Sequence, residues 1–139
     1  MWETEHSIET SAAPEQIRRL WAHVPGWPSW NGDIERIELD GPFAAGSRIV
    51  MTPRGEEPVE LRIAEATEPM SFVDEADLGN IVVRTVHRAD PTTGGRTRIT
   101  YRMEITGADA DTLGREIGPQ ISGDFPETLA ALAARAEAS

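Results

Sequence analysis

Hydrophobic and polar residues alternate along most of the chain, a pattern typical of strands with one face in the core and the other in solvent. The first such segment is residues 2–10, in which the even positions from Trp2 to Ile8 form one face and the odd positions are acidic or serine. Shorter segments of the same kind, bounded by glycine and proline turns, predict further strands. They cover residues 34–39, 48–52, 59–63, 71–77, 81–89 and 96–106, and Pro69 predicts a break before the fifth strand.

At most two short helices are predicted between the first two strands. Pro14 suits the first turn of a helix, and apolar side chains then recur on one face from Ile17 to Val24. The Pro25-Gly26 pair predicts the end of this helix. Residues 27–32 allow at most a second short helix or a structured turn, because they contain proline and glycine.

A long, interrupted helix is predicted at the C-terminal end of the chain. Its apolar stripe keeps a spacing of three or four residues and consists of Leu113, Ile117, Ile121, Phe125, Leu129 and Leu132. Because proline interrupts helical hydrogen bonding, we expect a kink between Gly118 and Pro126. Asp124 and Glu127 are then placed to cap the second half of the helix.

Composition narrows the possible functions. The length of 139 residues matches one domain, and the formal charge of −11 disfavours binding to nucleic acid or to anionic lipid surfaces. The chain has no cysteine for disulfides or thiolate metal sites, and no lysine for Schiff-base chemistry. No apolar run approaches the ~20 residues of a membrane span, and residues 1–5 do not begin a secretory leader. We therefore expect a cytoplasmic protein that does not insert into membranes.

Three segments resemble a known family. They are Pro14-Glu15-Gln16-Ile17 with Leu20-Trp21, the segment Trp27-Pro28-Ser29-Trp30-Asn31, and the hairpin from Val86-His87-Arg88 to Gly95-Arg96-Thr97-Arg98-Ile99-Thr100-Tyr101. In this order they resemble the START-like and birch-pollen-allergen-like superfamily (SRPBCC), and within it the bacterial polyketide cyclase/dehydrase-like branch. The resemblance implies an α+β helix-grip fold in a single domain of residues 1–139. In this fold a curved, antiparallel, seven-stranded sheet wraps around a long C-terminal helix, with two short helices after the first strand.

The resemblance also implies a ligand cavity between the sheet and the C-terminal helix, since the family includes lipid and hormone binders. We therefore expect the protein to bind a small hydrophobic, amphipathic or aromatic molecule, as a monomer or a homodimer. The family also includes aromatase/cyclases, so one alternative is a polyketide cyclase/dehydratase-type enzyme. Another is a protein-interaction module whose apolar groove holds a partner segment.

Histidine is the first candidate for acid–base chemistry because its usual pKa lies near neutrality. The chain has only His6, His23 and His87, which are too scattered to suggest a metal site, and no glycine-rich fingerprint suggests a cofactor. Strand alternation turns His87 and Tyr101 toward the interior on neighbouring strands, where the pair could act catalytically by polarising a ligand carbonyl. The alternative is that each is a core residue with a hydrogen-bond partner.

The remaining inward positions complete a candidate ligand-binding set. It comprises Trp30, Phe72, Val83, Thr85, His87, Ile99, Tyr101, Met103, Ile117, Ile121 and Phe125. Asn31 and Asp33, beside Trp30, could bind a polar group of the ligand. Gly114 and Gly118 either leave room for a cavity or pack closely on the sheet. The arginines of the opposite strand faces are expected to pair with carboxylates in solvent; these are Arg84, Arg88, Arg98 and Arg102.

Overall fold

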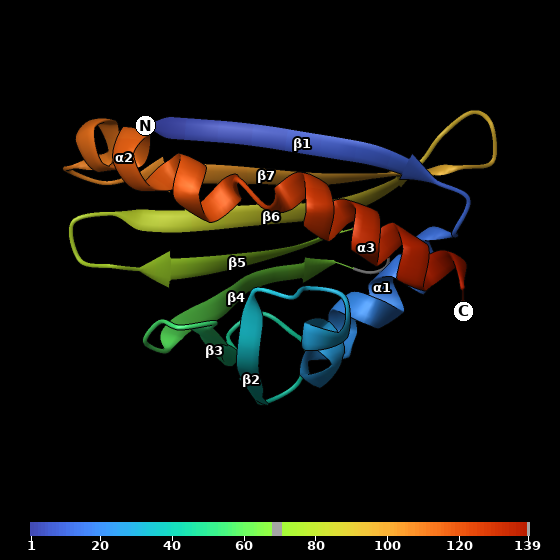
Figure 1. Ribbon diagram of the computed structural model, residues 1–139, viewed down its shortest axis with the longest axis horizontal. Coiled ribbons are helices and arrows are strands. Elements are labelled where there is room, and N and C mark those ends of the chain that lie inside the picture. Colours follow the sequence, from blue (N-terminus) through green and yellow to red (C-terminus); the bar gives the residue numbers. More distant parts are fainter. Residues whose placement is uncertain (68–70, 139) are drawn as a thin grey trace.

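The computed structural model describes residues 1–67 and 71–138, and its elements follow the predicted order (Figure 1). Strand β1 (Trp2–Thr10) leads into helix α1 (Pro14–Ala22) and the 3-10 helix η1 (Val24–Ser29). Six strands follow: β2 (Ile34–Asp40), β3 (Arg48–Pro53), β4 (Val59–Thr67), β5 (Ser71–Asp77), β6 (Val82–Pro91) and β7 (Thr97–Thr106). The last elements are helices α2 (Ala110–Ser122) and α3 (Phe125–Glu137). The break predicted at Pro69 lies outside the described residues.

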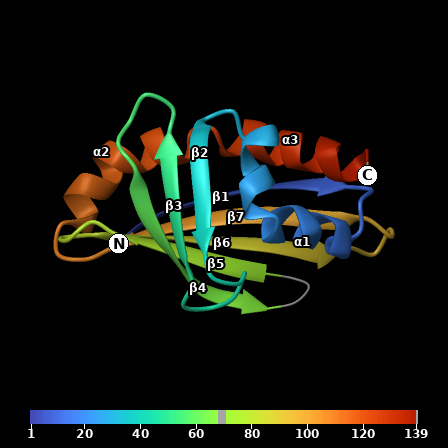
Figure 2. The same ribbon diagram turned by 90° about the horizontal axis from the view of Figure 1, so that it is seen from below.

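The seven strands form one antiparallel sheet in the order β1-β7-β6-β5-β4-β3-β2. Its register shifts after Ile34 in the β2–β3 pair and after Ile63 in the β4–β5 pair. Such bulges bend a sheet. Consistent with this, β2 and β3 stand well away from the plane of β6 and β7 (Figure 2). The predicted α+β helix-grip fold is confirmed.

Helices α2 and α3 run one after the other across one face of the sheet, chiefly along β1, and α1 lies beside α3 (Figure 1). Gly123 and Asp124 separate the two helices, and Pro126 stands in the first turn of α3. The kink predicted between Gly118 and Pro126 is therefore confirmed. Asp124 occupies the position before α3, as expected, but its side chain makes no capping hydrogen bond there.

The first helix ends earlier than Pro25-Gly26 predicts. Helix α1 stops at Ala22, and both residues lie inside η1, which begins at Val24. Pro25 fits the first turn of η1, where a missing N–H removes no helical hydrogen bond. The side chain of Gln16 accepts a hydrogen bond from the amide of Ala13 (2.7 Å) and so closes the N-terminus of α1.

Small residues bring α2 close to the sheet, and Leu113 and Ile117 of the predicted apolar stripe are partly buried against the core. The buried positions of α2 are Ala110, Gly114, Gly118 and Ser122. A Cβ at Gly114 would overlap the Cβ of Trp2 on β1, and one at Gly118 would overlap the Trp2 indole ring. Of the two interpretations of these glycines, close packing is confirmed and a cavity wall is wrong. Ile121 therefore lies on the flank of α2 and is 42% exposed, so its predicted inward position is wrong.

We predict that Gly114→Ala destabilises the fold by about 1–3 kcal/mol, because the new methyl group forces α2 away from β1. Urea denaturation of the variant and the wild type measures this difference. The control is Gly94→Ala, where an added Cβ would meet nothing within 4 Å. Equal stability of the Gly114 variant and the wild type would show that α2 does not rest on Trp2.

Candidate functional site

A row of four side chains crosses the inner face of the sheet. The register pairs His6 with Tyr101, Tyr101 with His87, and His87 with Phe72. Partners directly opposite one another in an antiparallel sheet share a face, so all four side chains point toward the helices. His87 and Tyr101 are accordingly neighbours, with ring centroids 4.6 Å apart, as the alternation of the two strands predicts.

His87 is held between aromatic rings. Its imidazole stacks on Phe72 at 3.8 Å, with an angle of 4° between the planes. Nδ1 lies 3.2 Å from the carbonyl oxygen of Phe72, to which it donates a hydrogen bond in the matching tautomer. Burial lowers the pKa of His87 to about 3, although this hydrogen bond opposes the shift. The imidazole is therefore neutral at pH 7 and is a weak base.

Tyr101 is also buried and has a hydrogen-bond partner. Its hydroxyl accepts a hydrogen bond from Nε1 of Trp21 (3.2 Å), and the indole of Trp27 in turn donates to the carbonyl of Trp21 (3.0 Å). Burial raises the pKa of Tyr101 above its usual value. The side chain stays a neutral phenol whose proton can still be donated to a further acceptor.

Asp74 is an inner-face residue that the sequence reasoning did not single out. It stands opposite Ile63 of β4 and Thr85 of β6, and it is 7% exposed. No hydrogen bond contributes to the pKa of its carboxyl, and its oxygens are not among the described side-chain atoms that are both fully enclosed and without a partner. Burial, and then the charge of Glu75, raise the pKa of Asp74 to about 7. The alternation of Phe72, Asp74 and Ala76 along β5 was the signal that could have revealed it.

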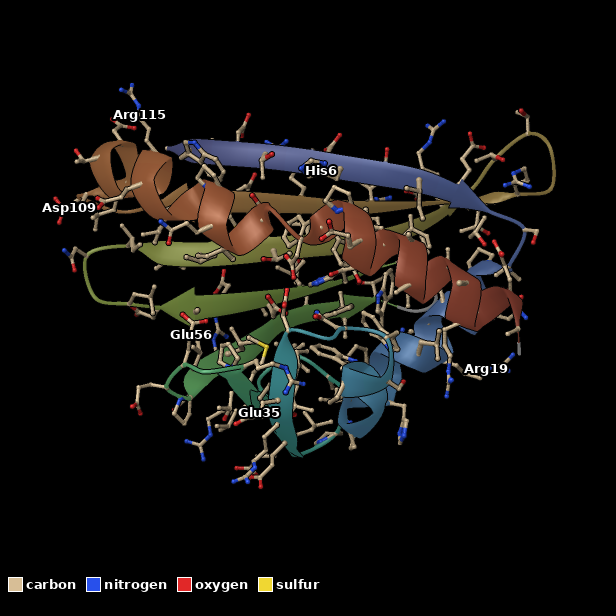
Figure 3. All side chains as sticks on the ribbon, in the orientation of Figure 1. His6, Arg19, Glu35, Glu56, Asp109 and Arg115 are labelled. Carbon is tan, nitrogen blue, oxygen red and sulfur yellow. The ribbon has the colours of Figure 1, made fainter. Side chains whose placement is uncertain are left out.

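Aromatic rings pack around His87 and Tyr101. Together with these two residues they form what we call the ring cluster: Trp21, Trp27, Trp30, Phe43, Phe72, His87, Tyr101 and Phe125. Contacts run from Trp30 through Trp27 to Phe72, and from His87 through Tyr101 to Phe125. Phe125 also meets the edge of His6. Figure 3 shows His6 on β1 beside the junction of α2 and α3.

A hollow of about 290 Å³ opens between the loop after η1 and helix α3, and we call it the helix-side hollow. Its lining residues are Trp30, Asn31, Gly32, Asp33, Asp124, Glu127, Thr128 and Ala131. The ring cluster reaches this hollow at Trp30, and Phe125 follows Asp124 in the chain. Asn31 and Asp33, selected from the sequence, do lie together here.

Asp33 and Asp124 face each other across the helix-side hollow. Burial, a hydrogen bond with Asp33 and the charge of Asp33 raise the pKa of Asp124 to about 7. Near neutral pH the Asp124 carboxyl is therefore protonated for part of the time. None of the described residues that line the hollow is basic.

The outer face of the sheet carries a network of ion pairs, as predicted for Arg84, Arg88 and Arg102. Arg84 pairs with Glu75 (2.9 Å), Arg88 with Asp90 (2.9 Å), and Arg102 with Glu3. A second hollow, of about 580 Å³, lies on this face and is lined by Glu5, Ser7, Ile8, Glu9, Arg88, Asp90, Arg98 and Thr100. Both hollows are open to solvent. Neither is the enclosed cavity that was expected beneath the C-terminal helix.

The structure brings only part of the predicted ligand-binding set together. Trp30, Phe72, His87, Tyr101 and Phe125 meet in the ring cluster. The other members are distributed differently: Ile99 and Met103 are completely buried, Val83 is buried, Thr85 and Ile117 are half-buried, and Ile121 is exposed. The candidate site is therefore the end of the inner face nearest α1, η1 and α3.

We predict that Asp74→Asn stabilises the protein increasingly as pH rises. The folded state holds the Asp74 proton up to about pH 7, whereas the unfolded state releases it near 3.8, so wild-type stability falls across this window. The gain from the substitution should be about 2–3 kcal/mol larger at about pH 8 than at about pH 5. Chemical denaturation at both pH values measures it, with the exposed Asp77→Asn as control. A gain independent of pH would mean that Asp74 keeps its ordinary pKa.

Within residues 1–67 and 71–138, no helix has the length and hydropathy of a membrane span. No curated protein matches the sequence. The chain resembles a START superfamily protein from Mycobacterium smegmatis (TM-score 0.72, 16% identity, 97% of each chain covered). It also resembles truncated norcoclaurine synthase from Thalictrum flavum, with a TM-score of 0.73 and 18% sequence identity over 94% of this chain and 90% of that chain. The di-domain ARO/CYC protein BexL matches with a TM-score of 0.77 and 19% sequence identity, over 99% of this chain but only 47% of that chain.

These structural matches establish a common fold. A family model described as "Polyketide cyclase / dehydrase and lipid transport" matches residues 1–137, nearly the whole chain. The sequence resemblance to the SRPBCC superfamily is thereby confirmed. The protein belongs to the polyketide cyclase / dehydrase and lipid transport family.

Proposed function

We propose that the protein binds a small hydrophobic or amphipathic molecule at the helix-side hollow, with the ring cluster as the apolar floor of the site. The observation that carries this proposal is that the ring cluster and the helix-side hollow adjoin each other. Trp30 belongs to both, and Phe125 adjoins Asp124 in the hollow wall. Ligand sites are typically concave and aromatic, with a few polar groups that fix orientation. Membership of a family described by lipid transport agrees with this function.

The size of the hollow limits how the ligand would bind. Its volume of about 290 Å³ lies just below the ~300–1,000 Å³ typical of small-molecule sites. A molecule with two fused rings is within this volume, whereas a much larger ligand would extend out of the hollow into solvent.

We predict saturable binding of the neutral fluorescent probe N-phenyl-1-naphthylamine, measured by its emission increase on titration. Ala131→Phe should weaken binding by about tenfold or more, because the added ring fills the hollow from α3. Ala130→Phe places the same ring on the exposed side of α3 and serves as the matched control. Thermal melts of both variants establish that each is folded.

Two results would contradict the proposed site. One is the absence of saturable binding to the wild type. The other is an equal affinity of the Ala131 and Ala130 variants for the probe, which would place the probe elsewhere on the protein.

A cyclase or dehydratase activity is the second candidate, and the observation that favours it is Asp74. Its pKa of about 7 suits a general base near neutral pH, and the charge of Asp74 acts on the buried phenol of Tyr101. Asp74 would remove a proton next to a ketone of a poly-β-ketone, and Tyr101 would donate a hydrogen bond to the resulting enolate. Attack of the enolate carbon on a second carbonyl forms the ring, and protonation with loss of water completes the reaction. His87, neutral and stacked, would position the substrate.

We predict that such an activity, assayed with poly-β-ketone substrates, rises with pH to a plateau above about pH 7, because the carboxylate is the active form. Asp74→Asn should abolish this rise, whereas Tyr101→Phe should lower the rate about tenfold or more at every pH below the phenol pKa. Product formation that is unchanged in both variants and in His87→Ala would remove the enzymatic assignment.

A further inference from the structure

Helix α3 presents a stripe of side chains to the helix-side hollow. Four lining residues come from the start of this helix, and positions i, i+3, i+4 and i+7 place them along one side of it: Asp124, Glu127, Thr128 and Ala131. The opposite wall is the loop after η1, which contributes Asn31 and Asp33. Polar side chains from two distant segments of the chain therefore line the same opening.

Thr128 is the buried polar residue of this stripe. It lines the hollow although it is only 7% exposed. Within residues 1–67 and 71–138 its hydroxyl forms no hydrogen bond, and it is not among the side-chain atoms that are both fully enclosed and without a partner. The small exposed part of Thr128 therefore includes the hydroxyl, which is accessible from the hollow.

Ser122, near the end of α2, shows the usual alternative for a buried hydroxyl on a helix. Its hydroxyl donates to the carbonyl of Gly118 one turn earlier (2.9 Å). The equivalent carbonyl for Thr128 is that of Asp124, which accepts only from the backbone amide of Thr128 (2.9 Å). The side chain of Thr128 thus keeps both a donor and an acceptor for a molecule in the hollow.

The remaining polar groups of the hollow also comprise donors and acceptors. The side-chain oxygen of Asn31 accepts a hydrogen bond from the amide of Asp33 (3.1 Å), which leaves the NH2 group of Asn31 as a donor. Burial, and then a hydrogen bond with Asp33, raise the pKa of Asp124 to about 7. Near neutral pH these two carboxyls carry less than two full charges, and their remaining lone pairs can accept from a ligand.

This combination selects one kind of polar group on the ligand. A carboxylate would meet three acidic side chains and, among the described lining residues, no base. An ammonium group has no lone pair and cannot accept from Thr128 or Asn31. A purely apolar ligand would cover the hydroxyl of Thr128 without giving it a partner, which costs free energy. A hydroxyl group is uncharged and both donates and accepts.

We propose that the helix-side hollow takes an uncharged amphipathic molecule whose polar end is a hydroxyl group on an apolar or aromatic body. The hydroxyl accepts a hydrogen bond from Thr128 and donates one to the carboxyl groups of Asp33 and Asp124. The body of the ligand lies against Trp30, where the ring cluster reaches the hollow. This inference rests on the proposed binding function and specifies its ligand class.

The test compares four probes that share one ring system: 1-naphthalenemethanol, its methyl ether, 1-naphthylmethylamine and 1-naphthoate. Each is titrated against the wild type at neutral pH to displace N-phenyl-1-naphthylamine. The alcohol should bind about threefold or more tightly than the ether, because the ether cannot donate a hydrogen bond. The amine should bind less tightly than the alcohol, and the carboxylate should bind most weakly.

Thr128→Val removes the hydroxyl and keeps the shape of the side chain. It should weaken binding of the alcohol by about threefold or more, whereas Thr128→Ser, which retains a hydroxyl, should restore it. Thr112→Val makes the same change at an exposed position of α2 and should behave as the wild type. Thermal melts establish that each variant is folded, and the ranking of the probes on the wild type does not depend on any variant.

The outcomes separate the two proposals. Equal affinities for the alcohol and the ether, with N-phenyl-1-naphthylamine still bound saturably, would overturn the inference and leave the binding function intact. So would an amine that binds more tightly than the alcohol and weakens between about 0.05 M and about 0.5 M salt, since that would assign the hollow to cations. An unchanged affinity for the alcohol in Thr128→Val would refute the role of Thr128. Absence of saturable binding by every probe would overturn both proposals.

Discussion

The contact of α2 with β1, in which Trp2 lies against Gly114 and Gly118, determines where the C-terminal helices cross the sheet. Because the helix has no side chain at these positions, its backbone comes close to β1, and α2 is held at one margin of the inner face. Helix α3 then begins with Phe125 over Tyr101. The centre of the inner face, on β6 and β5, is left to be covered by rings from α1 and η1. The position of the candidate site follows from this division of the inner face between the helices.

Most polar groups that face the interior have a partner there. His87 bonds to the carbonyl of Phe72, Tyr101 accepts from Trp21, and Thr97 donates to the carbonyl of Ala12. Each of these bonds also joins two separate elements or strands, so each fixes tertiary geometry as well as satisfying a buried group. Asp74 departs from this rule, since no hydrogen bond contributes to the pKa of its carboxyl. A group that is buried without such a bond is more informative about function than one that is satisfied, because burial without a partner is costly unless something else compensates.

Local periodicity accounted for the strands and for the meeting of His87 with Tyr101, since both depend only on alternation and on a short hairpin. It was incomplete for α2. Leu113 and Ile117 pack against the core as their spacing predicts, but Ile121 is exposed, and the fully buried positions of the helix are alanine, glycine and serine. A hydrophobic pattern identifies large apolar side chains. It does not identify positions at which a helix packs closely because it carries no side chain there. The sequence reasoning also missed Asp74, because an acidic residue within a strand is normally assigned to the solvent face. The helix-side hollow joins a loop and a helix about 90 residues apart in sequence, a pairing that requires tertiary structure.

His87 and Asp74 influence stability in opposite directions as pH changes. The pKa of His87 is depressed in the folded state. Stability therefore falls as pH drops below 6.5, because His87 becomes protonated in the unfolded chain but stays neutral in the folded one. The pKa of Asp74 is raised, so stability falls as pH increases from 3.8 to about 7. Between about pH 4 and 6.5 these two effects offset each other. The pKa of Asp124 is raised in the same way as that of Asp74, so the three groups together make stability fall as pH increases through this range, and the contribution of His87 is concealed beneath that of the two acids.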